Sequence, residues 1–247
     1  MQYLATLYDR EDSSSTPGTP EWDAEMSGYE AFGTKHGAAI LGGEALDAGA
    51  TGRTLRSPSA GAGDALVTDG PFAETAEVIG GYYLLEAETL DDVVEQAADI
   101  PAAWKPHGAV EVRPLVMLWA PDEPVEKQPD DTRYLALIYG PEAAAAVPES
   151  PEWDEMTARH GRFMEEQAGS LMSGYALHPV ATATTVRVRD GQVRVTDGPV
   201  HDSPDAIAGA YVVRAADPDA AVAVARAIPT SPGGAVELRP IVEIGEG

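Results

Sequence analysis

Two aspartates in the 247-residue chain stand in the same local sequence and are the first candidates for chemistry. Asp69 lies in Val-Thr-Asp-Gly-Pro-Phe, and Asp197 lies in Val-Thr-Asp-Gly-Pro-Val. An aspartate before Gly-Pro has a structural interpretation, because its carboxylate can accept backbone N–H bonds and hold the turn. It also has a functional interpretation, as a general base or as the carboxylate that orients an imidazole. Both interpretations stay open at this point.

Two histidines are candidates to complete such a pair. His107 precedes a predicted strand in a loop, where functional groups concentrate. His160 lies on the apolar side of a predicted helix, where the alternative is a core histidine with a satisfied hydrogen bond. An unperturbed imidazole titrates at about pH 6.5, so it can move a proton at neutral pH while an aspartate fixes its tautomer. The other histidines are expected at the surface: His36, His178 and His201.

Several other kinds of site are excluded or disfavoured. The chain has no cysteine, which excludes disulfides, thiolate metal sites and thiol nucleophiles. No HxH or HExxH spacing appears, so we expect no metal. The paired glycines lack the strand-to-helix context of a phosphate-binding loop, so we expect no nucleotide and no cofactor. The matching chemistry is proton abstraction, isomerisation or elimination on a small molecule.

The charge of the chain limits its partners. A net charge of −25 argues against nucleic acid, because phosphate binding needs clustered Lys and Arg. The one basic cluster is Arg187, Arg189 and Arg194, which needs either neighbouring carboxylates or an anionic ligand. No apolar run approaches the length of a membrane span, and the N-terminus does not read as a signal peptide. We therefore expect a cytoplasmic protein that does not bind membranes.

The two Asp-Gly-Pro turns belong to a duplication that runs from end to end. Residues 3–5 (Tyr-Leu-Ala) return at 134–136, and residues 110–114 (Val-Glu-Val-Arg-Pro) return at 236–240 with one change. A repeat of roughly 110 to 130 residues suits one small domain. The predicted boundaries are 1–118 for the first domain, 119–132 for a linker rich in Pro and acidic residues, and 133–247 for the second domain.

Each copy shows the same series of elements, β-α-β-(hairpin)-β-α-β, which is the ferredoxin-like plan. The predicted N-caps are Thr19 and Thr89 in the first copy and Ser150 and Asp217 in the second copy. Both helices of a copy should cover one face of an antiparallel sheet, which leaves the other face bare. In the last strand Val110 and Val112 point to one face, whereas Glu111 and Arg113 point to the other.

Two such sheets laid face to face would bury the bare faces. The predicted fold class is therefore α+β, with two ferredoxin-like domains that form a pseudo-dimeric α+β barrel within one chain. Further pairing of whole chains into homodimers stays open.

The residues around the first turn resemble the YCII-related family, specifically its DGPF branch. The resemblance rests on residues 69–75 (Asp-Gly-Pro-Phe-Ala-Glu-Thr), 80–83 (Gly-Gly-Tyr-Tyr) and 107–114, and it covers nearly all of both copies. It implies a ferredoxin-like subunit that pairs into a dimeric α+β barrel, with a cleft lined by a His and an Asp. Most members are uncharacterised, the domain is often encoded near or fused to sigma factors, and a few relatives are linked to dehydrochlorination of chlorinated aromatics.

The resemblance places the candidate site residues unevenly on the two copies. The residues that it implies for catalysis are Asp69, Glu74 and His107 in the first copy, and Asp197 and His160 in the second. His160 resembles the histidine that the wider family has on its first helix, whereas its counterpart in the first copy is Tyr29. Two equivalent active sites are therefore not expected.

Two hypotheses follow from these residues. The leading one is a small-molecule enzyme of the lyase or isomerase type, with Asp/His pairs in the inter-domain cleft. The alternative is a non-catalytic module that binds a small ligand or regulates another activity. The sequence does not decide whether the chain is an enzyme, and it does not identify a substrate.

Overall fold

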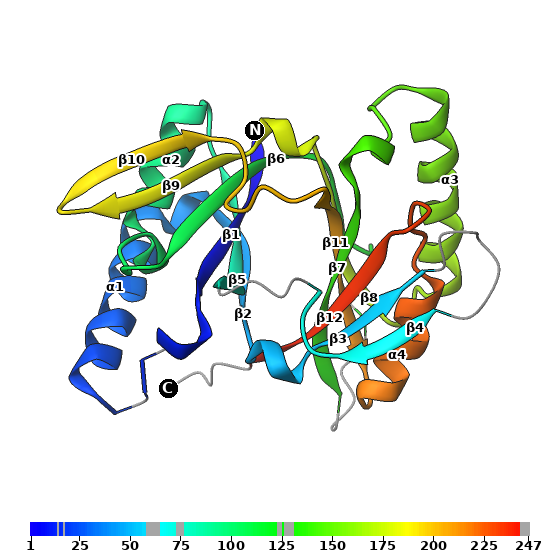
Figure 1. Cartoon of the computed structure of the whole chain (residues 1–247), viewed down its shortest axis with the longest axis horizontal. Helices are drawn as coiled ribbons and strands as arrows, with labels where there is room; N and C mark the ends of the chain where they lie inside the picture. The colour runs from blue at the N-terminus through cyan, green and yellow to red at the C-terminus, as the bar shows by residue number, and fades with distance from the viewer. Residues whose placement is uncertain are drawn as a thin grey trace. The chain divides into compact units, whose positions relative to one another are not determined.

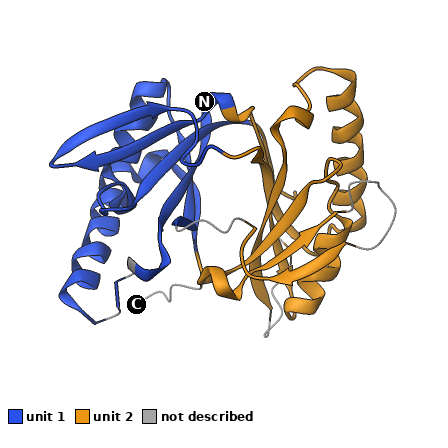
Figure 2. Ribbon diagram, viewed as in Figure 1, with its two compact units in different colours: residues 1–45, 74–115, 181–202 blue, residues 46–73, 116–180, 203–247 orange. Residues whose placement is uncertain are grey.

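The computed structural model (Figure 1) describes residues 1–13, 15–16, 18–57, 65–72, 77–122, 125 and 131–242. The chain divides into two compact units, which Figure 2 colours separately. Unit 1 consists of residues 1–45, 74–115 and 181–202, and unit 2 consists of residues 46–73, 116–180 and 203–247. Each unit thus contains one segment from the other sequence repeat.

Unit 1 is built on an antiparallel sheet with two helices. Its strands are β1 (Gln2–Arg10), β2 (Ile40–Leu46), β5 (Glu77–Glu86), β6 (Ala109–Trp119), β9 (Thr184–Arg189) and β10 (Gln192–Asp197), and its helices are α1 (Pro20–His36) and α2 (Leu90–Asp99). The strand order is β2–β5–β1–β6–β9–β10. The first four strands have the ferredoxin-like order, and the last two are a hairpin from the second repeat.

Unit 2 has the same arrangement, but its first four strands come from the second repeat and its hairpin comes from the first repeat. Its strands are β3 (Arg53–Arg56), β4 (Leu66–Asp69), β7 (Thr132–Pro141), β8 (Leu171–Leu177), β11 (Asp205–Ala215) and β12 (Ala235–Val242), and its helices are α3 (Pro151–Glu166) and α4 (Pro218–Ala227). The order β8–β11–β7–β12–β3–β4 is again antiparallel throughout. The two repeats have therefore exchanged their hairpins.

Short 3-10 helices connect several of these elements. They are η1 (Glu11–Ser13), η2 (Gly37–Ala39), η3 (Gly49–Thr51), η4 (Pro101–Ala103), η5 (Glu142–Ala144) and η6 (Val180–Thr182). Within the described ranges, no helix is both long and apolar enough to cross a membrane.

The four predicted N-caps are confirmed. The side chains of Thr19 and Ser150 accept hydrogen bonds from the backbone N–H three residues later, and a proline follows each cap. Thr89 forms a capping box with Asp92, and the Asp217 carboxylate accepts the N–H of Ala220. These local signals determine where each helix begins.

Each unit has one apolar core between its helices and one face of its sheet. In unit 1, Phe32 from α1 and Val93 from α2 pack with Val110 and Val112 of β6. In unit 2, Phe163 from α3 packs with residues of α4, β7 and β11. The predicted α+β class, with both helices of a unit on one face, is confirmed.

Arg189 attaches the exchanged hairpin to the rest of unit 1. Its guanidinium donates hydrogen bonds to the carbonyl oxygens of Ala103, at 2.9 Å, and Gly108, at 2.7 Å. Burial lowers the pKa of Arg189, and the neighbouring Arg187 and Arg194 lower it further. Backbone carbonyls thus satisfy this arginine, for which the sequence suggested carboxylates or an anionic ligand.

Candidate functional site

The two aspartates of the Asp-Gly-Pro turns lie at the surface. Asp69 ends β4 with 93% of its side chain exposed, and one carboxylate oxygen is 4.0 Å from Nε of Arg53. Asp197 ends β10 and is also exposed. Neither carboxylate accepts a hydrogen bond from the described residues of its turn.

Threonines and glycines hold these turns instead. The hydroxyl of Thr54 donates to the carbonyl of Gly70 at 2.9 Å, and that of Thr185 donates to the carbonyl of Gly198 at 2.8 Å. Gly70 and Gly198 have φ values of 93° and 98°, in the left-handed region that favours glycine. The repeated motif therefore has a structural reason that does not involve its aspartate.

Of the other two residues predicted for the first copy, the structure describes only His107. His107 is exposed in the turn after η4, within electrostatic reach of Asp12. Glu74 lies outside the described residues. Among the residues that the structure describes, no hydrogen bond or ion pair joins His107 or His160 to Asp69 or Asp197.

His160 forms the best-defined polar pair that involves a predicted residue. It projects from α3, and its Nδ1 lies 2.9 Å from the hydroxyl of Tyr211 on β11. Burial lowers the pKa of His160 to about 4, and Arg159 contributes in the same direction. Burial also raises the pKa of the Tyr211 hydroxyl. Both groups are therefore uncharged at neutral pH.

The partner of His160 determines which ring nitrogen carries its proton. The Tyr211 hydroxyl has no second partner in the described part of the chain, so we assign its hydrogen to Nδ1. The imidazole proton is then on Nε2, which has no hydrogen-bond partner among the described residues. The pair can present a neutral N–H donor to a small molecule.

A glycine on the neighbouring strand makes room for Tyr211. A Cβ added at Gly174 of β8 would lie 2.6 Å from Cε1 and 2.8 Å from Cδ1 of the tyrosine ring. Phe163 packs against the same ring, with centroids 5.2 Å apart. Unit 1 has the same glycine–tyrosine arrangement, because a Cβ at Gly43 would lie 2.6 Å from Cδ1 of Tyr83.

We expect Gly174→Ala to displace the Tyr211 ring, to break its bond to His160, and to destabilise the protein by about 1–3 kcal/mol. Urea unfolding measures the stability, and the NMR signal of the His160 ring reports the bond. Gly161→Ala on α3 is the matched control, because its Cβ would meet nothing within 4 Å. Equal stabilities of the two variants would contradict this role of Gly174.

Unit 1 has a different group of side chains beside the counterpart of His160. Lys105 Nζ lies 3.0 Å from Asp9 Oδ2 and 2.8 Å from Glu25 Oε1. The hydroxyl of Ser15 donates to Glu25 Oε2 at 2.5 Å, and Tyr29 follows one turn later on α1. Sequence reasoning missed this cluster; its only signal was a rare lysine two residues before His107.

The sequence analysis also did not include two buried ion pairs among the candidate site residues. Glu111 and Arg113 form one on β6, at 2.8 Å, and Glu237 and Arg239 form its counterpart on β12, at 3.3 Å. Their position opposite the core valines agrees with the predicted alternation. The signal was the Val-Glu-x-Arg-Pro sequence present in both copies.

Each buried glutamate holds the segment just after an Asp-Gly-Pro turn. Glu111 accepts the N–H of Val200 at 3.0 Å, and Glu237 accepts the N–H of Phe72 at 2.9 Å. Because Val200 and Phe72 belong to the exchanged hairpins, these bonds join the two repeats within one unit. In unit 2 the Phe72 ring also stacks on Tyr139, with centroids 4.2 Å apart.

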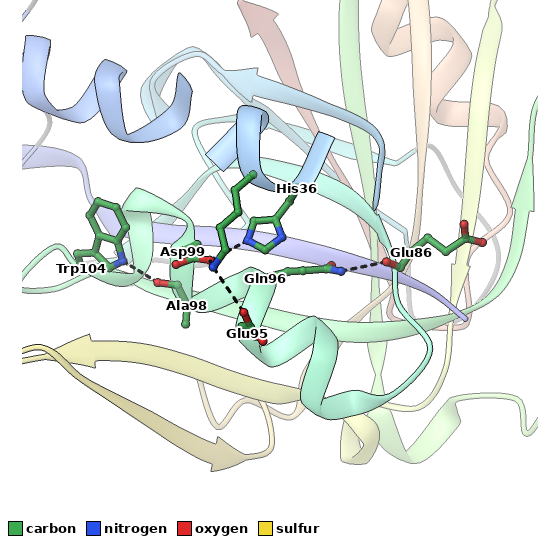
Figure 3. Close-up of polar contacts among 8 residues, drawn as sticks. His36, Glu86, Glu95, Gln96, Ala98, Asp99 and Trp104 are labelled. Atoms are coloured by element: carbon green, nitrogen blue, oxygen red, sulfur yellow. Dashed lines mark hydrogen bonds and ion pairs between the residues drawn. The ribbon is translucent and has the colours of Figure 1, made fainter. Parts of the chain in front are cut away.

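One histidine–carboxylate pair forms where none was predicted. His36 Nε2 lies 2.7 Å from Asp99 Oδ2, and Figure 3 shows these two side chains together. Lys35 Nζ contacts the same oxygen at 2.7 Å. Only 11% of the His36 side chain is exposed, so the expectation of a surface residue was wrong. Both residues are in the last turn of α1, where the positive charge of Lys35 complements the helix dipole. We interpret this pair as a structural link to α2.

The described residues contain no group of three or more His, Cys, Asp or Glu side chains that could hold a metal ion. The best-defined acid–base groups are a histidine–tyrosine pair in unit 2 and a lysine with two carboxylates in unit 1.

Comparison with known proteins shows which sequences this chain resembles. The sequence profile of the YCII-related domain matches residues 1–119 and again residues 132–245. A curated uncharacterized protein of Rhizobium meliloti (strain 1021) is 45% identical over 62 residues. That match covers 25% of this chain and 49% of the relative, so the chain spans about half the length of the relative.

Proposed function

The chain belongs to the YCII-related domain family, as two tandem copies, and we propose that it catalyses proton transfer on a small molecule at His160. The reaction would be of the lyase or isomerase type. The observation that carries the proposal is the hydrogen bond between Nδ1 of His160 and the hydroxyl of Tyr211. This proposal assigns no role to Asp69, Asp197, His107 or Glu74.

The neutral state of the pair supports a particular role. The Nε2–H group can donate a hydrogen bond to the oxygen of a carbonyl or phenol as negative charge develops there, while solvent water accepts the proton that leaves the substrate. Fixing the ring by a second hydrogen bond reduces the reorganisation that this step needs. Substrates with an enolisable carbonyl or a hydroquinone oxygen fit this chemistry. A cationic substrate group does not, because the Nε2–H donor would not stabilise a positive charge.

The test measures turnover of two probes, a 2-oxo acid and a chlorinated hydroquinone. NMR in D2O follows exchange of the proton next to the carbonyl of the first, and a chloride electrode follows release from the second. We expect His160→Gln to lower the active rate by about 10²–10⁴-fold, and Tyr211→Phe to lower it less. His178→Gln in the same unit is the control. Unchanged rates in both site variants would refute the proposal.

The surface positions of Asp69, Asp197 and His107 favour a second candidate function, a module that binds a small molecule without turning it over. The same probes distinguish the two functions. Binding without turnover raises the unfolding temperature, because the ligand stabilises the native state alone. A stabilising probe that is not consumed, with loss of the stabilisation in His160→Gln, would support the binding module.

A further inference from the structure

The β9–β10 hairpin of unit 1, which is yellow in Figure 1, ends in an open strand edge. In the described part of the chain, β10 pairs with β9 alone, and every residue of β10 is exposed. An edge strand presents unpaired backbone N–H and C=O groups, to which another extended chain can add. This edge therefore has room for one further strand.

One face of the open edge is apolar. Val195 lies opposite Val186, and Val193 lies opposite Val188, so these side chains share the face that packs on the core of unit 1. Val186 is fully buried, whereas Val193 and Val195 are 52% and 50% exposed. The apolar surface of the core thus continues onto a strand that the rest of the described chain leaves exposed.

The other face of the open edge carries two like charges. Arg187 of β9 and Arg194 of β10 lie directly opposite each other, an arrangement that destabilises a hairpin. Among the described residues, Arg187 has no hydrogen-bond or ion-pair partner, and Arg194 has only the exposed Asp190, at 3.7 Å. A negatively charged ligand on this face would relieve the repulsion.

The corresponding hairpin of unit 2 lacks both features. Ala65 and Val67, at the positions of the two exposed valines, pack against the core of unit 2. Arg56 of β3 lies opposite Leu66 rather than opposite a second arginine. Its guanidinium carbon is 4.4 Å from the centroid of the Phe72 ring. The exposed valines and the arginine pair are therefore particular to unit 1.

We propose that β10 binds an acidic, extended peptide segment of a partner protein, which adds to the sheet of unit 1 as one further strand. Backbone hydrogen bonds to β10 would hold the segment. Its carboxylates would lie on the face of Arg187 and Arg194, and its apolar side chains would lie beside Val193 and Val195.

Two other occupants fit this edge less well. A second copy of the chain, paired by a two-fold axis through two β10 strands, would place the arginine pairs of both copies on one face. A nucleic acid would contact the arginines but would not use the valines or the strand edge, and the net charge of −25 repels it. An acidic peptide satisfies the charges, the apolar face and the backbone together.

Two peptides of one length test the charge requirement at pH 7. The first alternates glutamate with valine, and the second has lysine in place of each glutamate. NMR titration follows the backbone amides of β10, and those of β4 serve as an internal control. We expect saturable shifts in β10 with the glutamate peptide, and at least about tenfold weaker binding of the lysine peptide. Equal binding of the two peptides, or equal shifts in β4 and β10, would overturn the proposal.

Two N-methylated forms of the glutamate peptide test whether it binds as a strand. One is methylated at every valine nitrogen and the other at every glutamate nitrogen. Because N–H groups of alternate residues in a strand point to opposite edges, we expect one form to bind and the other to fail. Binding of both forms at the affinity of the unmodified peptide would show that no strand is added.

One variant locates the site on the protein. Arg194→Leu introduces the residue that β4 has at this position, and it should keep the fold because it removes a like-charge pair. We expect it to weaken binding of the glutamate peptide about tenfold. Arg162→Leu on an exposed position of α3 removes the same charge and is the matched control.

Equal binding by the native protein and Arg194→Leu would contradict the assignment to β10. A dimer of the free protein that Arg194→Leu alters, or tighter binding of a short RNA than of the glutamate peptide, would assign the edge to one of the other occupants. His160 is in unit 2 and is not part of this surface, so this proposal and the proposed function fail independently.

Discussion

Replacing Glu237 with leucine will lower the free energy of unfolding by about 3–5 kcal/mol, because it leaves the charge of Arg239 buried without its partner. Only 1% of the Arg239 side chain and 4% of the Glu237 side chain are exposed. The carbonyl of Asp47 still accepts a hydrogen bond from Arg239, but a neutral acceptor does not replace a carboxylate. The N–H of Phe72 also loses its acceptor.

A double-mutant cycle separates the loss of the pair from the cost of a stranded charge. Glu237→Leu combined with Arg239→Met should recover most of the stability, since paired apolar side chains can replace a buried ion pair. Lys35→Met in the exposed Lys35–Asp99 pair is the control and should change stability by at most about 1 kcal/mol. The prediction is wrong if urea unfolding finds the double variant no more stable than Glu237→Leu.

His160 will make the folded protein less stable as the pH falls from about 6.5 to about 4. Above this range the imidazole is neutral in both states, so it contributes no pH dependence. Within it, the unfolded chain binds a proton at the ordinary pKa, whereas burial lowers the pKa of the folded protein to about 4. The difference reaches about 3 kcal/mol at the acid end of the range.

The measurement compares urea unfolding of the native protein and of His160→Gln at several values between pH 7 and pH 4. Carboxylates titrate in the same range, so the informative quantity is the difference between the two proteins. We expect the free energy of unfolding of His160→Gln to fall less than that of the native protein as the pH is lowered. A difference that is independent of pH, together with an ordinary titration of the His160 ring by NMR, would show that the imidazole is not buried in its neutral form.

The elements of the fold were predictable because their signals are local. Thr19 and Ser150 each precede a proline and begin a helix, and Asp190-Gly191 forms a hairpin turn in which both residues have positive φ. The duplication then doubled every such signal. Family membership was predictable for the same reason, since short motifs at fixed spacing carry it.

The pairing of the hairpins could not be predicted from these signals. The alternation of Val186 and Val188 with arginines requires one buried face, and a core strand of either repeat could supply it. In the structure, Val186 pairs with Val110 of the first repeat. Such a pairing depends on contacts between residues far apart in sequence, which no local pattern records.

The candidate sites show the same division between local and distant information. Helical spacing correctly placed His160 on the apolar side of α3, but its partner Tyr211 is on a strand that is apolar on both faces and gave no sign of a polar role. The Lys105 cluster combines residues from β1, α1 and the turn after η4. Only the folded chain brings those three segments together.

The exchange of hairpins also sets the order in which the protein can be completed on the ribosome. The β9–β10 hairpin that finishes the sheet of unit 1 lies at residues 184–197, and β12, which receives the β3–β4 hairpin of unit 2, lies at residues 235–242. Synthesis proceeds from the N-terminus, and domains usually fold as they emerge. Here the first repeat leaves the ribosome with the edge of β6 unpaired, and it carries a hairpin whose partner strand does not yet exist. The nascent chain must therefore tolerate an open sheet edge at β6 until β9 has been synthesised, and such edges are prone to aggregation.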